Sequence, residues 1–429
     1  MSSERVLIIS HAHPDFSLGG AEISAHAHWL ELRRRGVAAI LLARVDDSAA
    51  HLGAPFMARS AEGDEMLFAV PPVNHFIHSQ PNGSLVYEHL TNLLVRFRPT
   101  AVHFHHYVHL GLELIRVIRN FNPDISITVT LHEFLAICHA QGQMLKTSGS
   151  LCRKAAPLDC HACFPDLPAQ DFFMRELFIK SFFNLVDHFV CPSQFLRDRY
   201  IEWGLPREKM VVLENGQARF VNATMPELLD QDIERRFVVL GQLSRLKGTL
   251  VLLDAIRLLP KKLRRAIRIE IHGSVQYADD EFRSQLASGL TELSDTVRLC
   301  GAYLPEHVIG IIRRNGWVIV PSIWWENSPV VIQEAFAAGR PVICSNIGGM
   351  AEKVTDGVSG FHFRVNSAGD LASRIEGCAA RRDLWESMCA KLPQPPTIED
   401  TVSKLLQLYA GRGGPAIDHL QELPDSTTA

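Results

Sequence analysis

The stretch that decides the fold is residues 317–341, WVIVPSIWWENSPVVIQEAFAAGRP. Its first four residues are apolar and mostly β-branched, which predicts a buried parallel strand. Ser328 then suits an N-cap, and Pro329 suits the first helical position, where the missing N–H costs nothing. Gly339 and Pro341 are typical of the end of that helix. The stretch is therefore expected to form a strand, a loop and a helix.

Two glutamates in this stretch indicate the kind of ligand. Glu326 lies in the loop, and Glu334 follows in the helix. A helix that starts at the end of a parallel strand attracts anions, because its first N–H groups are unpaired and its dipole is positive there. Two carboxylates would repel a bare phosphate, so we expect them to accept hydrogen bonds from hydroxyl groups. A nucleotide sugar carries both kinds of group.

The composition is that of an ordinary globular protein. The chain has 429 residues, 47% of them hydrophobic and 21% charged, which is enough for two or three domains. A net charge of -4 and the lack of a basic tail exclude a nucleic-acid partner. With no long apolar run and no signal peptide, we expect a cytoplasmic protein without structural disulfides among its nine cysteines.

Strands and helices alternate twice along the chain. The first series starts at the apolar run 6–10, and Gly19 and Gly20 follow where the first helix begins. They form a phosphate- or substrate-binding turn or merely a tight turn, but not the dinucleotide fingerprint, so NAD and FAD are disfavoured. A second series begins at 237, with strands expected at 267–272, 297–300, 317–320, 341–344 and 361–363. Two successive series predict two doubly wound α/β domains facing a central cleft.

The expected domain boundaries follow from these series. We expect an N-terminal Rossmann-like, acceptor-binding domain over residues 1–215, with a cysteine-rich insertion at 134–169. A C-terminal Rossmann-like domain that binds the nucleotide sugar is expected over 216–395. A helix at 396–412 is expected to pack back on the first domain, and 413–429 to be a disordered tail.

Histidines follow two strands of the first domain. His103, His105, His106 and His109 lie at or after the strand 101–105, where substrate lining or ordinary loop positions are favoured over a metal site. His132 follows the next strand, at the sheet edge where α/β proteins place their ligands.

Five motifs in order resemble the family four retaining glycosyltransferases of the GT-B fold. The spacing of Glu326 and Glu334 matches that family's Glu-x7-Glu signature, within the block PSIWWENSPVVIQEAFAAGRPVICSNIGGMAEKVTDGVSGF. The other motifs are Gly19-Gly20-Ala21-Glu22, Leu131-His132-Glu133, Glu214-Asn215-Gly216 and residues 241–248, GQLSRLKG. The resemblance covers residues 5 to about 410.

The resemblance implies a role for several residues. Glu334 would bind the nucleotide ribose and Glu326 the donor sugar, while Lys247 would neutralise the diphosphate. Many relatives place an arginine where this chain has Gln242; Arg245, three residues on, is the candidate substitute. The remaining members implied for the donor site are Gly20, whose backbone would approach the diphosphate, His132 near the sugar, and Asn327, Ser328 and Pro329 in the signature loop.

The implied activity is transfer of a sugar, with retention, from a nucleotide diphosphate sugar to a hydroxyl acceptor in glycan, polysaccharide or glycoconjugate synthesis. The acceptor would be a sugar, a lipid-linked glycan or a small molecule. No Asp-x-Asp motif follows a strand, so no catalytic metal is expected. The alternatives are a GT-B epimerase or phosphorylase, and a non-catalytic nucleotide-sugar-binding subunit, which the glutamine at position 242 would suit.

Four of the nine cysteines fall in one irregular segment. Cys138, Cys152, Cys160 and Cys163 lie there, and the last two have the Cys-x2-Cys spacing of a tetrahedral metal site. His139 and His161 are substitute ligands. We expect a structural zinc, with an iron–sulfur cluster, a disulfide pair or unligated thiols as the alternatives.

The helix expected at 172–183 has two interpretations. Its phenylalanines, with Arg175 and Lys180, suit peripheral contact with the inner face of a membrane that carries the acceptor. Core packing explains the same residues and is favoured.

Overall fold

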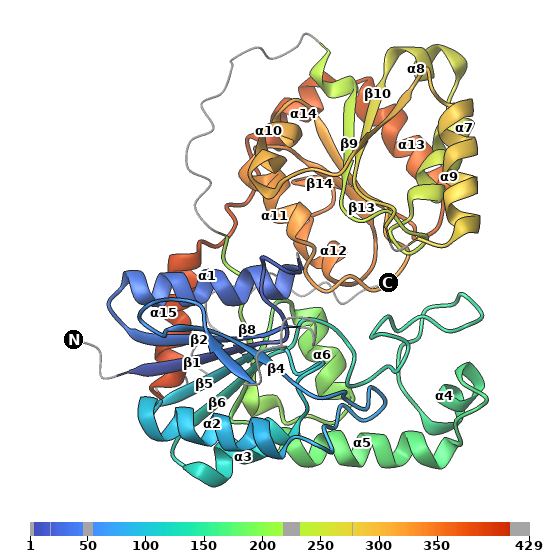
Figure 1. Ribbon diagram of the computed structural model, residues 1–429. Coiled ribbons are helices and arrows are strands. Elements are labelled where there is room, and N and C mark those ends of the chain that lie inside the picture. Colours follow the sequence, from blue (N-terminus) through green and yellow to red (C-terminus); the bar gives the residue numbers. More distant parts are fainter. Residues whose placement is uncertain (1–3, 18, 46–54, 218–231, 277, 412–429) are drawn as a thin grey trace. The chain divides into compact units, whose positions relative to one another are not determined.

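The computed structural model describes residues 4–17, 19–45, 55–217, 232–276 and 278–411. Within these ranges the chain forms two compact α/β units (Figure 1). Unit 1 runs to Gly216 and resumes at Thr397, and unit 2 comprises Gln217–Pro396 together with Ser148–Leu151. The expected tail at 413–429 and residues 218–231 lie outside the described residues.

Unit 1 is built on one eight-stranded sheet. The strands lie in the order β3 (Phe56–Ala58), β4 (Glu65–Ala69), β2 (Ala38–Val45), β1 (Arg5–Ser10), β5 (Ala101–His105), β6 (Ser126–Thr130), β7 (His188–Cys191) and β8 (Met210–Val212). All neighbours are parallel except β3 and β4, which are antiparallel.

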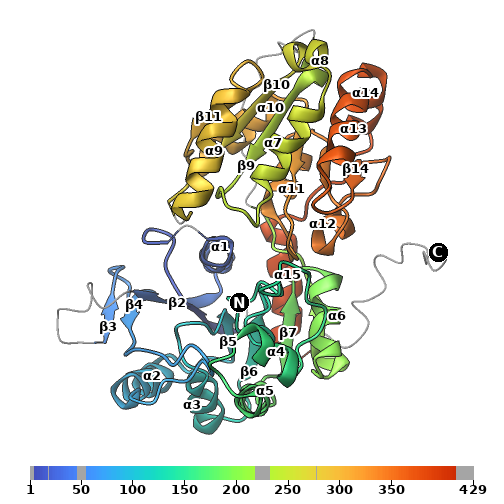
Figure 2. The ribbon, with the colours of Figure 1, turned by 90° about the vertical axis from the view of Figure 1, so that its right-hand side faces the viewer.

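Helices cover both faces of this sheet, as Figure 2 shows. One face carries α1 (Gly20–Arg34) and α15 (Ile398–Tyr409), which contact each other, and the other carries α2 (Ser84–Phe97), α3 (Glu113–Phe121) and α5 (Ala169–Phe183). The remaining helices are α4 (Pro157–Cys163), which contacts α5, α6 (Gln194–Glu202) and the 3-10 turn η2 (Arg207–Lys209).

The core of unit 1 explains why the chain returns to it after unit 2. Alternate residues of a strand share a face, so Val6 and Ile8 of β1 point together. They join Trp29 of α1 and Val402 and Leu405 of α15 in one buried cluster. Each such side chain contributes about 1.5–3 kcal/mol when it is removed from water, so α15 is bound by its apolar face.

Unit 2 is built on a six-stranded, parallel sheet. The strands lie in the order β11 (Val297–Gly301), β10 (Arg268–His272), β9 (Arg236–Leu240), β12 (Trp317–Val320), β13 (Val342–Ser345) and β14 (Gly360–Phe363). They are short apolar runs, as expected for strands covered on both faces.

Two apolar layers flank the sheet of unit 2. One contains α7 (Thr249–Leu258), α9 (Asp280–Glu292), α13 (Ala368–Ala379) and α14 (Arg382–Cys389). The other contains α10 (Val308–Arg313), α11 (Val330–Ala337) and α12 (Gly348–Lys353). The remaining elements are α8 (Lys261–Ala266) and the 3-10 turns η3 (Ile233–Arg235) and η4 (Pro305–His307).

Three local expectations were wrong. Pro329 is the N-cap of α11 and has an extended ψ of 116°, so the helix begins one residue later than expected. Ser328 does not cap it, and its buried hydroxyl has no hydrogen-bond partner among the described residues. The strand β3 and the helix α4 were also missed, because three residues of strand and seven of helix are too short to show a period.

Candidate active site

Each unit has one topological switch point, where consecutive strands start to be added on opposite sides of the first strand. In unit 1 it lies between β1 and β5, and in unit 2 it lies between β9 and β12. Loops that leave the carboxyl ends of such strands diverge, and ligands of open α/β sheets bind in the crevice between them. The switch points therefore locate the candidate sites before any side chain is considered.

The switch point of unit 2 carries an ion pair whose carboxylate is buried and whose lysine is partly exposed. Lys247 comes from the loop after β9, and its Nζ lies 2.6 Å from Oε1 of Glu326, which comes from the loop after β12. Ser322 Oγ and Trp324 Nε1 donate to the same Oε1, at 2.7 and 2.9 Å. The lysine Nζ also lies 5.5 Å from the centroid of the Trp324 ring, within cation–π range.

This arrangement holds Glu326 ionised. The residue is only 7% exposed, and burial alone would raise its pKa. The charge of Lys247 and the hydrogen bonds from Lys247, Ser322 and Trp324 outweigh burial and lower the pKa below the ordinary value. All the hydrogen bonds described for this carboxylate reach Oε1, so Oε2 remains as an acceptor for a ligand hydroxyl. Glu326 is thus buried, and not at the rim of the loop as its position in the sequence had indicated.

Two glycines allow the loops of this site to interlock. A Cβ on Gly248 would lie 1.8 Å from the Pro321 carbonyl oxygen, and its φ of 71° is left-handed. A Cβ on Gly349 would lie 1.5 Å from the Asn327 carbonyl oxygen, while its N–H donates to the Glu326 carbonyl at 2.8 Å. No other residue fits either place, so the backbone fixes Glu326 between the loops after β9 and β13.

Glu334 differs from Glu326 in its environment. It lies just over one turn into α11 and is partly buried. Burial raises its pKa to about 7, and no opposite charge offsets that effect. A hydrogen bond donated by a ligand hydroxyl would stabilise the ionised form of this carboxyl group.

The other residues of unit 2 that were expected to bind the donor lie in different environments. Gln242 is exposed in the loop after β9. Arg245 is turned toward the start of α9, where it lies 3.0 Å from both Glu281 Oε2 and Gln285 Oε1. Asn327 lies in the interlocked loop. Arg245 and Lys247 are two residues apart in the sequence but have different partners. Lys247 pairs with Glu326, and Arg245 pairs with α9.

The switch point of unit 1 gathers a polar cluster. His11 follows β1, His106 follows β5, and Glu133 follows β6. The His11 and His106 ring centroids lie 4.7 Å apart; His106 Nε2 is 3.3 Å from Glu133 Oε1, and His11 Nε2 is 3.4 Å from Glu22 Oε1. His132 stacks on His106 at a centroid distance of 6.1 Å.

Burial sets the protonation of this cluster. It lowers the pKa of His132 to about 3 and that of His106 well below its ordinary value. It raises the pKa of Glu133 to about 8. Both histidines are then neutral and Glu133 is protonated at pH 7, so the cluster offers uncharged donors and acceptors, which suit hydroxyl groups.

The sequence motifs indicate a role for His132 and Gly20 in this unit. Gly20 is exposed at the first position of α1. Glu22 and Glu133 belong to the same motifs without an implied role, and His106 is expected either to line the substrate or to hold an ordinary loop position. Their place in the sequence could have identified them as site residues. Each one follows a parallel strand or lies at the start of the first helix.

The two cations of α5, for which core packing was favoured over membrane contact, are engaged within unit 1. Arg175 is buried in α5, and Lys180 is bound to Glu176 and to the Trp203 carbonyl. Neither cation is presented to a membrane surface, although Phe173 and nearby apolar residues of α5 are exposed. None of the helices within the described ranges is both long and apolar enough to cross a membrane.

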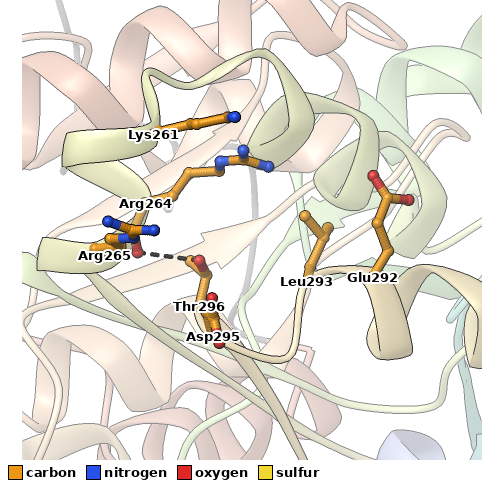
Figure 3. Close-up of a pocket in the computed structure, with 7 residues that line it drawn as sticks. All are labelled: Lys261, Arg264, Arg265, Glu292, Leu293, Asp295 and Thr296. Atoms are coloured by element: carbon orange, nitrogen blue, oxygen red, sulfur yellow. Dashed lines mark hydrogen bonds between the residues drawn. The ribbon is translucent and has the colours of Figure 1, made fainter.

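A hollow on unit 2 lies away from the site (Figure 3). It is lined by Lys261, Arg264, Arg265, Glu292, Leu293, Asp295 and Thr296. Thr296 precedes β11 and donates to the Arg264 carbonyl at 3.0 Å. The hollow is therefore at the amino ends of the strands, the edge opposite Lys247 and Glu326.

Two protein-family models match the chain in succession. The model described as Glycosyltransferase Family 4 matches residues 18–217, and the model described as Glycosyl transferases group 1 matches residues 223–388. Each match covers most of one unit. The protein is thus built from glycosyltransferase domains, and the expectation of a GT-B fold with two parallel-sheet α/β domains is confirmed.

Curated relatives match parts of the chain. The lipopolysaccharide 1,2-N-acetylglucosaminetransferase of Salmonella typhimurium is 26% identical over 61% of this chain and 60% of its own length. A D-inositol 3-phosphate glycosyltransferase of Corynebacterium jeikeium is 35% identical over 34% of this chain and 36% of its own. The chain therefore spans less than two thirds of the length of these relatives.

Solved structures match nearly the whole chain. Anabaena Alr3699/HepE in complex with UDP is 17% identical, with a TM-score of 0.66 over 95% of this chain and 100% of that one. Sucrose-phosphate synthase from Thermosynechococcus elongatus is 17% identical, with a TM-score of 0.67 over 95% and 99%. At these identities the likeness concerns the fold.

Proposed function

We propose that this protein is a retaining glycosyltransferase that moves a sugar from a nucleoside diphosphate sugar to a hydroxyl acceptor. The observation that carries the proposal is the pair of Lys247 and Glu326, 2.6 Å apart at the switch point of unit 2. A cation there can neutralise a departing diphosphate, and a fixed carboxylate can hold the sugar that is transferred. An epimerase or a phosphorylase has no support from a particular residue, and a binding subunit has that of Gln242 alone.

The chain's own residues have separate tasks in this reaction. Lys247 stabilises the charge that develops on the diphosphate as the bond to the sugar anomeric carbon breaks. Oε2 of Glu326 accepts a hydrogen bond from a sugar hydroxyl, and Glu334 accepts from the ribose. The acceptor oxygen bonds to the anomeric carbon, and its proton passes to the leaving diphosphate.

The state of Glu326 argues against a double displacement as the route to the proposed retention. A double displacement needs a carboxylate nucleophile. Oε1 of Glu326 already accepts three hydrogen bonds, and the lowered pKa makes the group a weak base. We therefore favour attack on the same face that the diphosphate leaves. Lys247 supplies the cation, so the donor site needs no divalent metal, and any metal in the protein has a structural role elsewhere.

The donor and acceptor are proposed by chemistry. UDP-glucose is the first donor to test, because the structural neighbour HepE was solved with UDP, with UDP and glucose, and with UDP-glucose. The neutral cluster of His106, His132 and Glu133 suits recognition of an acceptor's hydroxyls. The relatives that act on lipopolysaccharide and inositol phosphate make a glycan or polyol hydroxyl the class to test.

The test is a panel of nucleotide sugars with a mixture of oligosaccharide and polyol acceptors. Release of nucleoside diphosphate that depends on acceptor, with a product one glycosyl unit heavier and of unchanged anomeric configuration by NMR, supports the proposal. Turnover without acceptor to an epimer or a sugar phosphate contradicts it. So does saturable binding of a nucleotide sugar with no turnover under any condition.

A first prediction concerns Glu334. We expect UDP to bind more tightly as pH rises from 6 to 8, because a pKa of about 7 leaves the carboxyl half protonated in the free protein and the ribose favours the ionised form. Calorimetry in buffers of different ionisation enthalpy should show proton release on binding. Glu334→Gln should bind UDP about tenfold more weakly, roughly the loss of one charge-assisted hydrogen bond. The affinity of this variant for UDP should also vary less with pH than that of the wild type, because only the ionisation of UDP itself remains. Equal pH profiles of the two proteins would contradict the ribose assignment.

A second prediction separates Arg245 from Lys247. Arg245 is already paired with α9, so a diphosphate gains little from it unless those contacts break. We expect Arg245→Ala to change the Kd for UDP by less than about threefold, well below the 1.5–3 kcal/mol of a hydrogen bond to a charged group. Lys247→Ala should weaken binding at least about tenfold in the same calorimetric titration. Equal losses in both variants would show that Arg245 moves to the diphosphate.

A further inference from the structure

The segment between β6 and α5 has little regular secondary structure to stabilise it. Residues 131–156 contain no helix or strand, and the following α4 has seven residues, none of them buried. Leu158 on α4 is 77% exposed. A helix this short is marginal alone, and ordering a long irregular loop costs about 1–2 kcal/mol per residue. Apolar burial anchors the first half of the segment, where Leu131, Phe134, Ile137 and Met144 are buried. No side chain of residues 145–163 is fully buried, so this second half needs another interaction.

Four cysteine sulfurs converge on this segment. Cys160 and Cys163 lie one turn apart on α4. The side chains of Cys138, Cys152 and Cys163 lie close enough to Cys160 to interact with it electrostatically, which places the four thiols near one another. No disulfide joins any of the nine cysteines, all of which are within the described ranges. A set of four thiols that is not oxidised matches the donor set of a tetrahedral metal ion.

The backbone around Cys138 is shaped for a thiolate. The backbone N–H groups of Met144 and Ala140 are directed at the Cys138 sulfur. The turn that brings them there uses left-handed φ angles of 50° at Gln141 and 68° at Gly142. Cys152 is held beside it, since its N–H donates to the Met144 carbonyl at 2.8 Å. Backbone donors directed at sulfur are of use to an anionic ligand.

Arg175 gives an independent indication of negative charge at this place. It is 3% exposed, and its guanidinium donates to the carbonyl oxygens of Phe76, Ala136 and Leu135. No carboxylate in the described part of the chain forms an ion pair with it. The side chains of Tyr107, Cys138 and Cys160 lie close enough to interact with it electrostatically. A buried cation needs a counter-charge, and four thiolates around a divalent ion carry two net negative charges.

We propose that Cys138, Cys152, Cys160 and Cys163 bind one zinc ion, which fixes the loop after β6 and the helix α4. The proposal does not rest on the transferase activity. The four sulfurs are not among the groups of potential ligands that already lie within 4.8 Å of one another in the described ranges, so the ion draws them together on binding.

The groups of potential ligands that already lie within 4.8 Å of one another are less suited to binding a metal ion. The group of His28, His103 and His105 is fully buried. Both ring nitrogens of His103 are engaged, with the Tyr409 hydroxyl at 2.6 Å and Thr130 Oγ1 at 2.7 Å, and His28 Nδ1 is bonded to His105 Nε2 at 2.9 Å. Hydrogen bonds account for these four nitrogens, while His28 Nε2 and His105 Nδ1 have no hydrogen-bond partner among the described residues. Four cysteines, in contrast, have the donor chemistry of a tetrahedral zinc site.

The first experiment uses the whole chain without added metal. Mass spectrometry of the purified protein should find close to one zinc per chain. Replacement by cobalt should give the charge-transfer absorption of thiolate ligands, which identifies sulfur donors without any mutation. Metal-free protein with four reactive thiols and an unchanged melting temperature after zinc addition overturns the proposal. Stoichiometric iron with sulfide, or a mass lower by the hydrogens of a disulfide, also overturns it.

Variants locate the ion. Cys160→Ser should reduce zinc content at least about tenfold and expose the segment 131–163 to limited proteolysis, as the loss of one of four ligands predicts. Cys389→Ser, a partly exposed cysteine of α14, is the matched control and should keep its zinc. Cys300→Ser tests the rival group of Glu270, His272 and Cys300. Zinc that is lost from the Cys300 variant and kept by the Cys160 variant refutes the proposal.

Discussion

Lys247→Ala should lower kcat/KM by about 10²–10³-fold, the usual cost of removing one preorganised group that stabilises developing negative charge. The lysine is the described cation that pairs with Glu326 at the switch point of unit 2. Coupled detection of released nucleoside diphosphate measures the loss. Lys261→Ala is the matched control, because Lys261 is an exposed lysine of the same unit at the opposite edge of the sheet. The activity of this variant should equal that of the wild type.

The lysine also has a structural role, which a second variant separates from catalysis. Without Lys247 the Glu326 carboxylate keeps only Ser322 and Trp324 as partners while it is 7% exposed, so unit 2 should be destabilised. The double variant Lys247→Ala/Glu326→Gln removes the unpaired charge. It should recover much of the lost melting temperature and none of the activity. Recovery of both would mean that Lys247 acts only through the fold.

Unit 1 should lose stability steeply below pH 6.5. His28, His103, His105 and His106 are at most 5% exposed, and burial lowers the pKa of each far below its ordinary value, to about 3 for His28. The unfolded chain therefore binds more protons than the folded one below about pH 6.5. Stability is complete above that pH and falls as pH decreases, by about 1.4 kcal/mol per histidine per pH unit. Four histidines amount to about 6 kcal/mol at pH 5.5, as an upper bound.

Urea unfolding at pH 5.5 and 7.5 measures this effect. His28→Gln keeps an amide that can hydrogen-bond His105 but does not titrate, so its stability should change less with pH than that of the wild type. His307→Ala removes an exposed histidine of unit 2 and should leave the pH dependence as it is. A wild-type protein equally stable at both pH values would show that these histidines titrate normally.

The two series of alternating strands and helices were predictable from the sequence, because apolar runs and turn residues are local signals. The strand 317–320 and the helix end at Gly339 were found where expected. The start of α11 was not, because Pro329 can serve as N-cap or as first helical residue, and the choice depends on how the loop packs against α12. Elements of a few residues, such as β3 and α4, have no period to detect.

The sequence by itself determined which residues are available: two glutamates seven residues apart, a lysine after a strand and four cysteines in one segment. Only the tertiary structure decided how they are used. Pairing with Lys247 keeps Glu326 ionised, while burial without a partner raises the pKa of Glu334 to about 7. Arg245, two residues before Lys247, turns to α9 instead. The charge state of a side chain depends on neighbours from distant strands, and the order of strands in a sheet sets those neighbours.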